Sequence, residues 1–183
     1  MRIISGKHRG RIINPPKTFS ARPTTDMAKE SLFNIIANRY DFEDMVILDL
    51  FAGTGSIGYE FASRGAKEIV CVEKDYNSYS FINNTALQMQ LPLKCIRANV
   101  FTFLKNCSAP YDIIFADPPY DMPDSEKTVD LVFENHLLKE DGIMIFEHSK
   151  RLNFTSHSHF SELRTYGKVH FSFFTLKNNF AEK

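Results

Sequence analysis

Short apolar segments alternate with amphipathic segments along the middle of the chain. The apolar segments have the length and the branched or aromatic content of buried strands, and they cover residues 46–50, 68–73, 93–97, 111–116 and 142–147. Helices are expected between them, from a glycine-rich turn at residues 53–58 to about residue 63, and then over residues 76–89, 100–106 and 125–138. Regular alternation of strand and helix predicts an α/β fold with a mostly parallel, doubly wound sheet.

The N-terminal part departs from this alternation. Residues 1–13 repeat the pattern Arg-Ile-Ile on either side of a glycine-flanked basic stretch. This pattern predicts a β-hairpin whose isoleucines face the body of the protein and whose basic tip faces outward. A helix is then expected to begin at Thr25 or Asp26, either of which can cap it, and to end near Asn38.

The C-terminal part is also different. Two β-rich runs, residues 160–166 and 168–176, are joined tightly at Gly167. Such a short joint requires an antiparallel pair. The expected organisation is therefore a basic extension at residues 1–22, one domain at residues 23–176, and a polar tail at residues 177–183.

Composition favours a globular protein of one domain. The chain has 183 residues, of which 43% are hydrophobic. We find no apolar run near the roughly 20 residues of a membrane helix and no apolar leader, so a cytoplasmic protein is expected. Cys71, Cys95 and Cys107 form no C-x-x-C pair, which predicts reduced thiols. The histidines have no accompanying ligand pattern, so we expect no metal.

The formal net charge is zero, but the charges are unevenly distributed. Residues 1–25 hold six basic residues and no acidic one, whereas the rest of the chain holds 16 basic and 22 acidic residues. A basic arm on a mildly acidic body is a plausible footprint for a phosphate backbone. The alternative is a solvated arm whose charge has no partner.

The glycine-rich turn matches the pattern G-x-G-x-x-G at Gly53, Gly55 and Gly58, after a strand and before a helix. Glu73 follows 20 residues after the first glycine, at the end of the next strand, where it can accept hydrogen bonds from ribose hydroxyls. Two ligands fit, a nicotinamide dinucleotide and S-adenosylmethionine. Asp49 favours S-adenosylmethionine, because a second carboxylate would repel a pyrophosphate and could bind an ammonium group.

The residues Asp117-Pro118-Pro119-Tyr120 follow the predicted strand at residues 111–116. The prolines stiffen this corner and offer carbonyl oxygens without N–H donors, and an ionised Asp117 is an acceptor only. Tyr120 adds a flat ring on which a base could stack. An acceptor-rich corner beside an aromatic ring suits the exocyclic amine of a nucleobase. The alternative is a proline-rich turn in which Tyr120 is a packing residue.

Several of these segments together resemble the bacterial family of 16S ribosomal RNA guanine-N2 methyltransferases, which are class I enzymes dependent on S-adenosylmethionine. The matching segments are residues 2–11, 22–26 and 48–55 and the corner at residues 117–120. The N-terminal segments are the specific part, because DNA adenine methyltransferases share the central ones. The resemblance implies a Rossmann-like domain that methylates a guanine N2 amine of small-subunit ribosomal RNA.

The resemblance also implies roles for particular residues. Cofactor contacts are expected from Asp49, Phe51, Gly53, Gly55, Glu73, Asn99 and Val100. The last two would border the adenine, although aspartate is commoner in related enzymes where this chain has Asn99. Substrate contacts are expected at the catalytic corner formed by Asp117, Pro118, Pro119 and Tyr120. RNA contacts are expected from Lys7, His8, Arg9, Arg11 and Arg22.

Three rival functions stay open on the sequence. A DNA adenine-N6 methyltransferase would usually need an added target-recognition region, for which the chain has little room. A protein-glutamine methyltransferase typically has asparagine where this chain has Asp117. A non-catalytic RNA-binding factor of ribosome assembly could retain the same fold. The expected partner is ribosomal RNA, in a small-subunit particle, and the default oligomeric state is a monomer.

Overall fold

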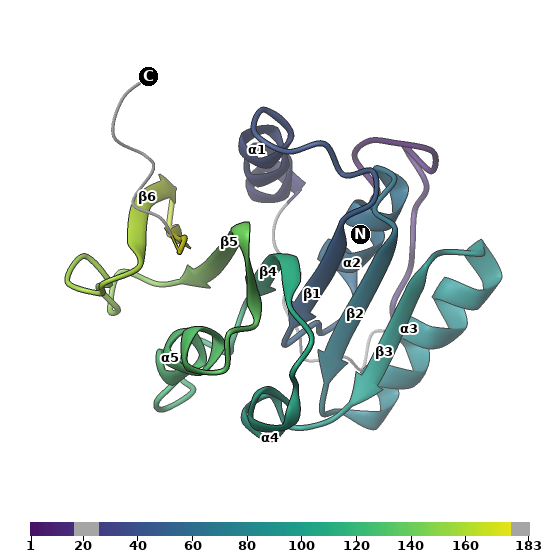
Figure 1. The fold of residues 1–183 in the computed structure, drawn as a ribbon. Helices are drawn as coiled ribbons and strands as arrows, with labels where there is room; N and C mark the ends of the chain where they lie inside the picture. The colour runs from purple at the N-terminus through teal and green to yellow at the C-terminus, as the bar shows by residue number, and fades with distance from the viewer. Residues whose placement is uncertain (17–25, 177–183) are drawn as a thin grey trace.

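The computed structural model describes residues 1–16 and 26–176 (Figure 1). Arg22, and the predicted helix cap Thr25, lie outside the described residues. The strands are β1 (Val46–Leu50), β2 (Glu68–Glu73), β3 (Leu93–Arg97), β4 (Tyr111–Ala116), β5 (Leu138–His148), β6 (Phe160–Tyr166) and β7 (Val169–Phe174). The helices are α1 (Asp26–Ala37), α2 (Ser56–Ser63), α3 (Tyr76–Met89), α4 (Val100–Asn106) and α5 (Lys127–Glu134).

The strands form one seven-stranded sheet in the order β3-β2-β1-β4-β5-β7-β6. The first five strands in this order are parallel, and β7 is antiparallel to both β5 and β6. This confirms the predicted parallel sheet with an antiparallel pair at its C-terminal end. The strand order reverses between β1 and β4, and open α/β sheets bind ligands beyond the carboxyl ends of strands at such a switch point.

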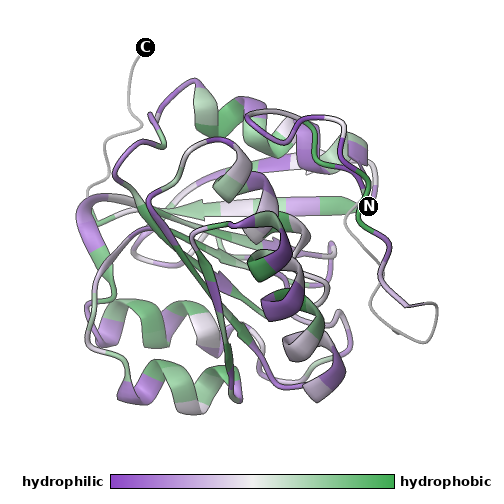
Figure 2. Cartoon of the chain, turned by 90° about the vertical axis from the view of Figure 1, so that its right-hand side faces the viewer, coloured by the Kyte–Doolittle hydropathy of each residue, from purple (hydrophilic) through white to green (hydrophobic). Residues whose placement is uncertain are grey.

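Helices cover both faces of the sheet, as a doubly wound fold requires (Figure 1). Buried residues of α1, α2, α3 and the N-terminal hairpin form one core with the sheet. Buried residues of α4 and α5 form a second core on the other face. Figure 2 shows hydrophobic strands inside these layers and helices whose hydrophilic positions lie on the outside. No helix among the described residues is long and apolar enough to span a membrane.

The end of α5 differs from the prediction. The predicted helix near residues 125–138 is present, but its predicted end is wrong, because α5 ends at Glu134 and β5 already begins at Leu138. The reason lies in the backbone: His136 has a φ of 52°, which no right-handed helix allows, and Leu137 N–H bonds back to the carbonyl of Val132 at 3.0 Å. The strand that follows is consequently longer than residues 142–147.

The predicted N-terminal hairpin is present as one antiparallel bridge, between Arg2 and Ile12. The N–H of Ile3 bonds the carbonyl of Arg11 at 3.0 Å, which holds the two arms together. Ile3 and Ile13 are buried in the core. The expectation that all isoleucines face the body is wrong for Ile12, which is 66% exposed because it lies on the opposite side of the arm from Ile13.

Candidate active site at the carboxyl ends of the strands

The turn after β1 has an unusual backbone. Phe51, Gly53 and Gly55 have φ angles of 59°, 55° and 79°, in the left-handed region that favours glycine. A Cβ added to Gly55 would lie 2.9 Å from a ring carbon of Tyr59, so this position also requires glycine for space. Phe51 is a bulky residue held in a conformation that costs energy, and such strain is concentrated at functional sites. The turn leads directly into α2 and presents its backbone at the edge of the sheet.

Two carboxylates hold this turn. The Asp49 Oδ2 atom accepts the N–H of Gly58 at 3.1 Å. The Glu73 carboxylate accepts the N–H of Gly53 at 2.9 Å and that of Asp75 at 2.8 Å. Asp49 is 1% exposed, and burial raises its pKa to about 7, against the opposing effect of the Gly58 N–H bond. Both predicted cofactor acids therefore lie at the glycine turn.

Asn99 and Val100 lie at the start of α4, beside the end of β2. The Asn99 side chain caps this helix by accepting the N–H groups of Phe101 and Thr102 at 3.0 and 3.2 Å. Val100 is buried in the core, whereas Asn99 is exposed. The structure thus places Asn99 at the same edge of the sheet as Glu73, because the N–H of the intervening Ala98 bonds the Glu73 carbonyl at 3.1 Å.

The corner at residues 117–120 lies at the next strand end. The N–H of Asp117 reaches the carbonyl of Leu50 at 3.4 Å, so the corner begins where β1 also ends. Asp117 is half-buried and Pro118 is buried, whereas Pro119 and Tyr120 are exposed. The structure therefore brings this predicted catalytic corner and the glycine turn to one edge of the sheet.

Glu147, near the end of β5, is a candidate site residue that the sequence interpretation missed. Phe146 pairs with Ala116 across the sheet, which places Glu147 beside Asp117. The Tyr120 hydroxyl donates a hydrogen bond to Glu147 Oε1 at 3.3 Å. Burial first, and then the charges of Glu147 and Asp49, raise the pKa of Asp117 well above its ordinary value. An acid at the end of the predicted strand 142–147 was the signal that could have found it.

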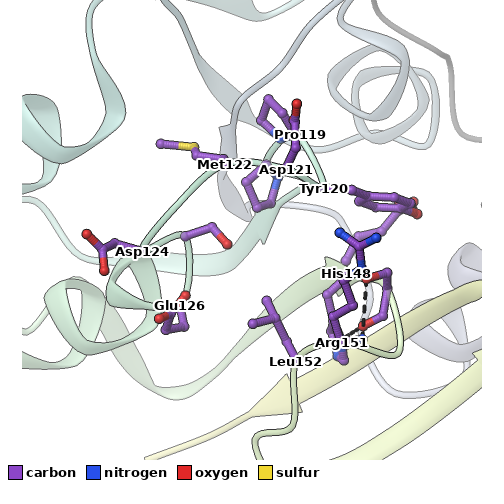
Figure 3. Close-up of a pocket in the computed structure, with 13 residues that line it drawn as sticks. Pro119, Tyr120, Asp121, Met122, Asp124, Glu126, His148, Arg151 and Leu152 are labelled. Atoms are coloured by element: carbon purple, nitrogen blue, oxygen red, sulfur yellow. Dashed lines mark hydrogen bonds between the residues drawn. The ribbon is translucent and has the colours of Figure 1, made fainter.

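Residues 118–120 of the corner and the end of β5 line a cavity of about 280 Å³. Its lining includes Tyr120, Met122, Asp124, Glu147, His148 and Arg151. Figure 3 shows Met122, Asp124 and Glu126 on one side of the cavity and Tyr120, His148 and Arg151 on the other. A carboxylate wall, an exposed aromatic ring and a cation thus surround a space into which a flat polar ligand could enter.

Those predicted RNA-binding residues that the structure describes lie in the hairpin, at or beside its tip. Lys7, Arg9 and Arg11 are exposed, whereas His8 is half-buried. Partial burial, and then the charges of Lys7 and Arg11, lower the pKa of His8. Arg22 lies outside the described residues, so the structure does not place it with this group.

The hairpin is anchored to α2 by polar contacts that the sequence interpretation did not anticipate. The Glu60 carboxylate accepts the backbone N–H groups of Ile4 and Ser5 at 2.8 and 3.0 Å. Ser63 accepts the N–H of His8 at 3.0 Å through its hydroxyl oxygen. All eight residues of α2 are buried, because the sheet covers one side of the helix and the hairpin covers the other.

A buried lysine completes this anchor. Lys29, from α1, is 1% exposed and donates from its Nζ to the Arg2 carbonyl at 2.7 Å and to Ser56 Oγ at 3.2 Å. The same Nζ lies 3.7 Å from Glu60 Oε2. Charges are buried only when they are paired or hydrogen-bonded. The hairpin, α1 and the first turn of α2 are therefore tied together at Ser56, within the glycine turn.

The cysteines and possible metal ligands do not alter this site. Cys71 and Cys95 are buried, and burial raises the pKa of Cys95 to about 12. Within residues 1–16 and 26–176, no group of three or more His, Cys, Asp or Glu side chains could hold a metal ion.

Comparisons with known proteins show the relatives of the chain. A family model described as "Conserved hypothetical protein 95" matches residues 1–175. The chain is 33% identical over 186 residues to ribosomal RNA small subunit methyltransferase D of Buchnera aphidicola subsp. Baizongia pistaciae, covering 98% of this chain and 94% of the relative. It is 34% identical over 148 residues to the protein of the same name from Escherichia coli K12, covering 80% and 74% of the two chains.

Solved structures give the same relationship. A hypothetical protein of Thermus thermophilus matches with a TM-score of 0.85 at 28% identity, covering 96% of this chain and 99% of that chain. The protein named "Putative methyltransferase yhhF" from Escherichia coli matches with a TM-score of 0.83 at 29% identity, covering 95% of this chain and 96% of that chain. The similarity thus spans the N-terminal hairpin, the central sheet and the C-terminal strand pair.

Proposed function

The chain belongs to the family of ribosomal RNA small subunit methyltransferase D, and from this membership we propose that it transfers a methyl group from S-adenosylmethionine to the exocyclic N2 amine of a guanine in small-subunit ribosomal RNA. The observation that carries the proposal is the meeting of Asp117 and the glycine turn at one sheet edge. This arrangement puts an acceptor for an amine beside a binding turn for a nucleoside.

The residues present fit S-adenosylmethionine. The left-handed turn at Gly53 and Gly55 allows the close backbone approach that a nucleoside ligand requires. Glu73 would accept hydrogen bonds from ribose hydroxyls, and the buried Asp49 would contribute negative charge toward a cationic ligand. The remaining contacts would come from Phe51, Asn99 and Val100 at the same edge. When bound, this cofactor supplies a sulfonium methyl group that is already activated for transfer.

In this proposal, residues of the corner hold and activate the N2 amine of the guanine. Asp117 and the Pro118 carbonyl accept the two N–H bonds of guanine N2, which favours a more tetrahedral nitrogen whose lone pair can attack. Tyr120 holds the base flat, and Pro119 keeps the corner stiff. As the N–C bond forms and the S–C bond breaks, the nitrogen loses one proton. Burial raises the pKa of Asp117, so its carboxylate suits the role of acceptor for this proton.

The hairpin supplies the contact with RNA. Lys7, Arg9 and Arg11 form an exposed basic tip, to which His8 adds an imidazole of lowered pKa. Basic side chains of this kind bind phosphates without reading sequence. The target base must leave its stack, at a cost of a few kcal/mol, unless the RNA already presents it splayed out. We propose that Arg22 also contacts the RNA, that the protein acts as a monomer, and that an assembled small-subunit particle is the substrate.

The test measures transfer of a labelled methyl group to free ribosomal RNA, small-subunit particles, DNA and protein. Asp117→Ala should nearly abolish transfer to the ribosomal substrate, while binding of S-adenosylmethionine, measured by calorimetry, is retained. Asp41→Ala is the matched control, because it removes an exposed carboxyl before β1, at the opposite edge of the sheet. Near-normal turnover in Asp117→Ala refutes the assigned role. Transfer to DNA or protein alone, or RNA binding without transfer, favours the corresponding rival function.

A further inference from the structure

The basic tip of the hairpin lies away from the sheet edge that carries the glycine turn and the corner. The N–H of Lys7 bonds the carbonyl of Ser63, the last residue of α2, at 2.7 Å. This helix begins at Ser56, within the glycine turn, and its eight residues rise about 12 Å. Figure 1 shows this part of the hairpin, in purple, at the opposite end of the sheet from the arrowheads of β1 and β2. A phosphate bound at the tip would therefore lie about one helix length from the carboxyl edge.

The target base brings its own phosphates to the corner. A base is extruded by rotation about its backbone, so the phosphates that flank it stay within one nucleotide of the site. Such phosphates are bound by positively charged side chains and by N–H or O–H donors. The corner offers carboxyl and carbonyl oxygens, which are acceptors and do not bind the oxygens of a phosphate. A cation beside the corner is therefore needed in addition to the hairpin tip.

Arg151 is a cation in this position. It lines the cavity that Tyr120 also lines, and it is the only lysine or arginine among the described lining residues. Figure 3 shows both side chains on the same side of the cavity, across from Asp124 and Glu126. Arg151 is exposed, and in the part of the chain that the structure describes it forms no ion pair. Asp124 instead pairs with Lys127 at 3.1 Å, which leaves the guanidinium of Arg151 available to a ligand.

The backbone around Arg151 is anchored. Arg151 lies in a turn directly after β5, in which the N–H of Leu152 bonds the carbonyl of Ser149 at 3.3 Å. The buried His148 donates from its Nδ1 to the same carbonyl at 2.8 Å, and its Nε2 lies 2.8 Å from Ser172 Oγ on β7. On the other side of the turn, Leu152 packs against the core formed with α4 and α5. Because both ends of the turn are held, Arg151 can bind a ligand without the cost of ordering this backbone.

We propose that Arg151 binds a backbone phosphate of the target nucleotide and thereby holds the extruded base at the corner. The arginine fork matches the oxygens of a phosphate and stays charged at all working pH values. The contact forms only after the base has left its stack, so it stabilises the reactive arrangement more than the initial complex. The hairpin tip binds the RNA, and Arg151 positions the nucleotide. This inference rests on the proposed function, because it assigns a substrate contact of the same site.

Separate roles for the tip and for Arg151 predict different kinetic effects. Loss of a hydrogen bond to a charged group changes an equilibrium by at least about tenfold. Arg151→Ala should therefore slow methyl transfer at saturating RNA at least about tenfold, whereas the dissociation constant for RNA should change by less than about threefold. Lys150→Ala is the matched control, because Lys150 is an exposed cation of the same turn that does not line the cavity. Its loss acts through screened electrostatics, so the rate should fall by less than about threefold.

The experiment first maps the guanosine that wild type methylates in ribosomal RNA, either free or in a small-subunit particle. The same substrate is then prepared with a neutral methylphosphonate in place of the phosphate on the 5′ or the 3′ side of that guanosine. One of the two replacements should slow single-turnover transfer by wild type at least about tenfold and should have little effect on Arg151→Ala, because both changes remove the same contact. Binding of S-adenosylmethionine, measured by calorimetry, should be equal in wild type and Arg151→Ala.

Four outcomes overturn the inference. They are a normal rate in Arg151→Ala, an equal loss of rate in Lys150→Ala, equal sensitivity of wild type and Arg151→Ala to both neutral phosphates, and a weakened affinity of Arg151→Ala for S-adenosylmethionine. The last outcome would assign the cation to the cofactor and not to RNA. Arg151→Gln replaces Arg151→Ala if thermal unfolding shows that the alanine variant does not fold. If wild type methylates no RNA, the proposed function fails instead.

Discussion

The buried carboxyl of Asp49 should make binding of the proposed cofactor depend on pH. Burial raises its pKa from an ordinary 3.8 to about 7. At about 1.36 kcal/mol per pH unit, keeping this carboxyl ionised in the unliganded fold at neutral pH costs about 4 kcal/mol. Because the pKa of Asp49 is higher in the folded protein than in the unfolded chain, protonation of Asp49 stabilises the fold. This stabilisation is complete below about pH 4 and is lost as the pH rises through about 7.

A cationic ligand above the glycine turn reverses this preference. Positive charge near Asp49 favours its ionised form, so the pKa falls on binding and a proton is released. The affinity for S-adenosylmethionine should therefore rise with pH, by up to about tenfold per pH unit, and level off above about pH 7. A bound pKa of about 5 would give a total gain of about 100-fold. Asp49→Asn should remove most of this slope, since the amide does not titrate.

Calorimetric titration between pH 5 and pH 7, in buffers of different ionisation enthalpy, measures both the affinity and the proton release. The α-amino group of the ligand keeps its proton in this range. Asp117 lies at the same edge, and its pKa is also raised, so Asp117→Asn is titrated in parallel and should retain the slope that Asp49 causes. An affinity that stays flat over this range, or the same slope in Asp49→Asn as in wild type, refutes the reasoning.

Three further predictions concern the hairpin. In Gly6→Ala the added Cβ would lie 1.8 Å from a carbonyl oxygen of α2, so urea denaturation should show a loss of stability beyond that of Gly10→Ala, which has almost the same φ but no atom within 4 Å. Glu60→Gln leaves the charge of Lys29 buried with a weaker partner. Thermal unfolding should show that the free energy of unfolding falls by up to about 3–5 kcal/mol, which is the cost of breaking a buried ion pair. Arg9→Ala should weaken RNA binding uniformly and reduce the slope of log affinity against log salt by about one, whereas an unchanged slope would place this side chain away from phosphates.

Much of the fold was predictable because its signals are local. Apolar runs at residues 46–50 and 111–116 give the strands, and the glycine pattern gives the turn into α2. The site is then predictable from the topology, because parallel strands end at one edge of the sheet and residues that follow different strands meet there. The positive φ of His136 carried no comparable signal, and the predicted helix consequently ran on to residue 138.

The sequence interpretation missed features that depend on pairs of distant residues. Lys29 and Glu60 are separated by 31 positions, and each alone is typical of a solvated helix surface. Their burial follows from the hairpin covering α2, which no local pattern reveals. Ile12 is a second example. The Arg-Ile-Ile pattern predicts the arm of the hairpin, but it does not determine which side of the arm faces the core.

The charge distribution of the molecule is explained by the two surfaces that the proposed reaction needs. Asp49, Glu73, Asp117 and Glu147 bring four carboxyl groups to one edge of the sheet. Such an edge suits a cationic methyl donor and the N–H groups of a base, but it repels RNA phosphates. The basic hairpin supplies the attraction separately, and Lys29 and Glu60 anchor it to the helix that begins at the glycine turn. Because this anchor is buried, the position of the basic tip is fixed relative to the carboxylates. A net charge of zero is thus compatible with binding RNA, since the basic residues of the hairpin and the carboxyl groups at the sheet edge lie on separate parts of the molecule.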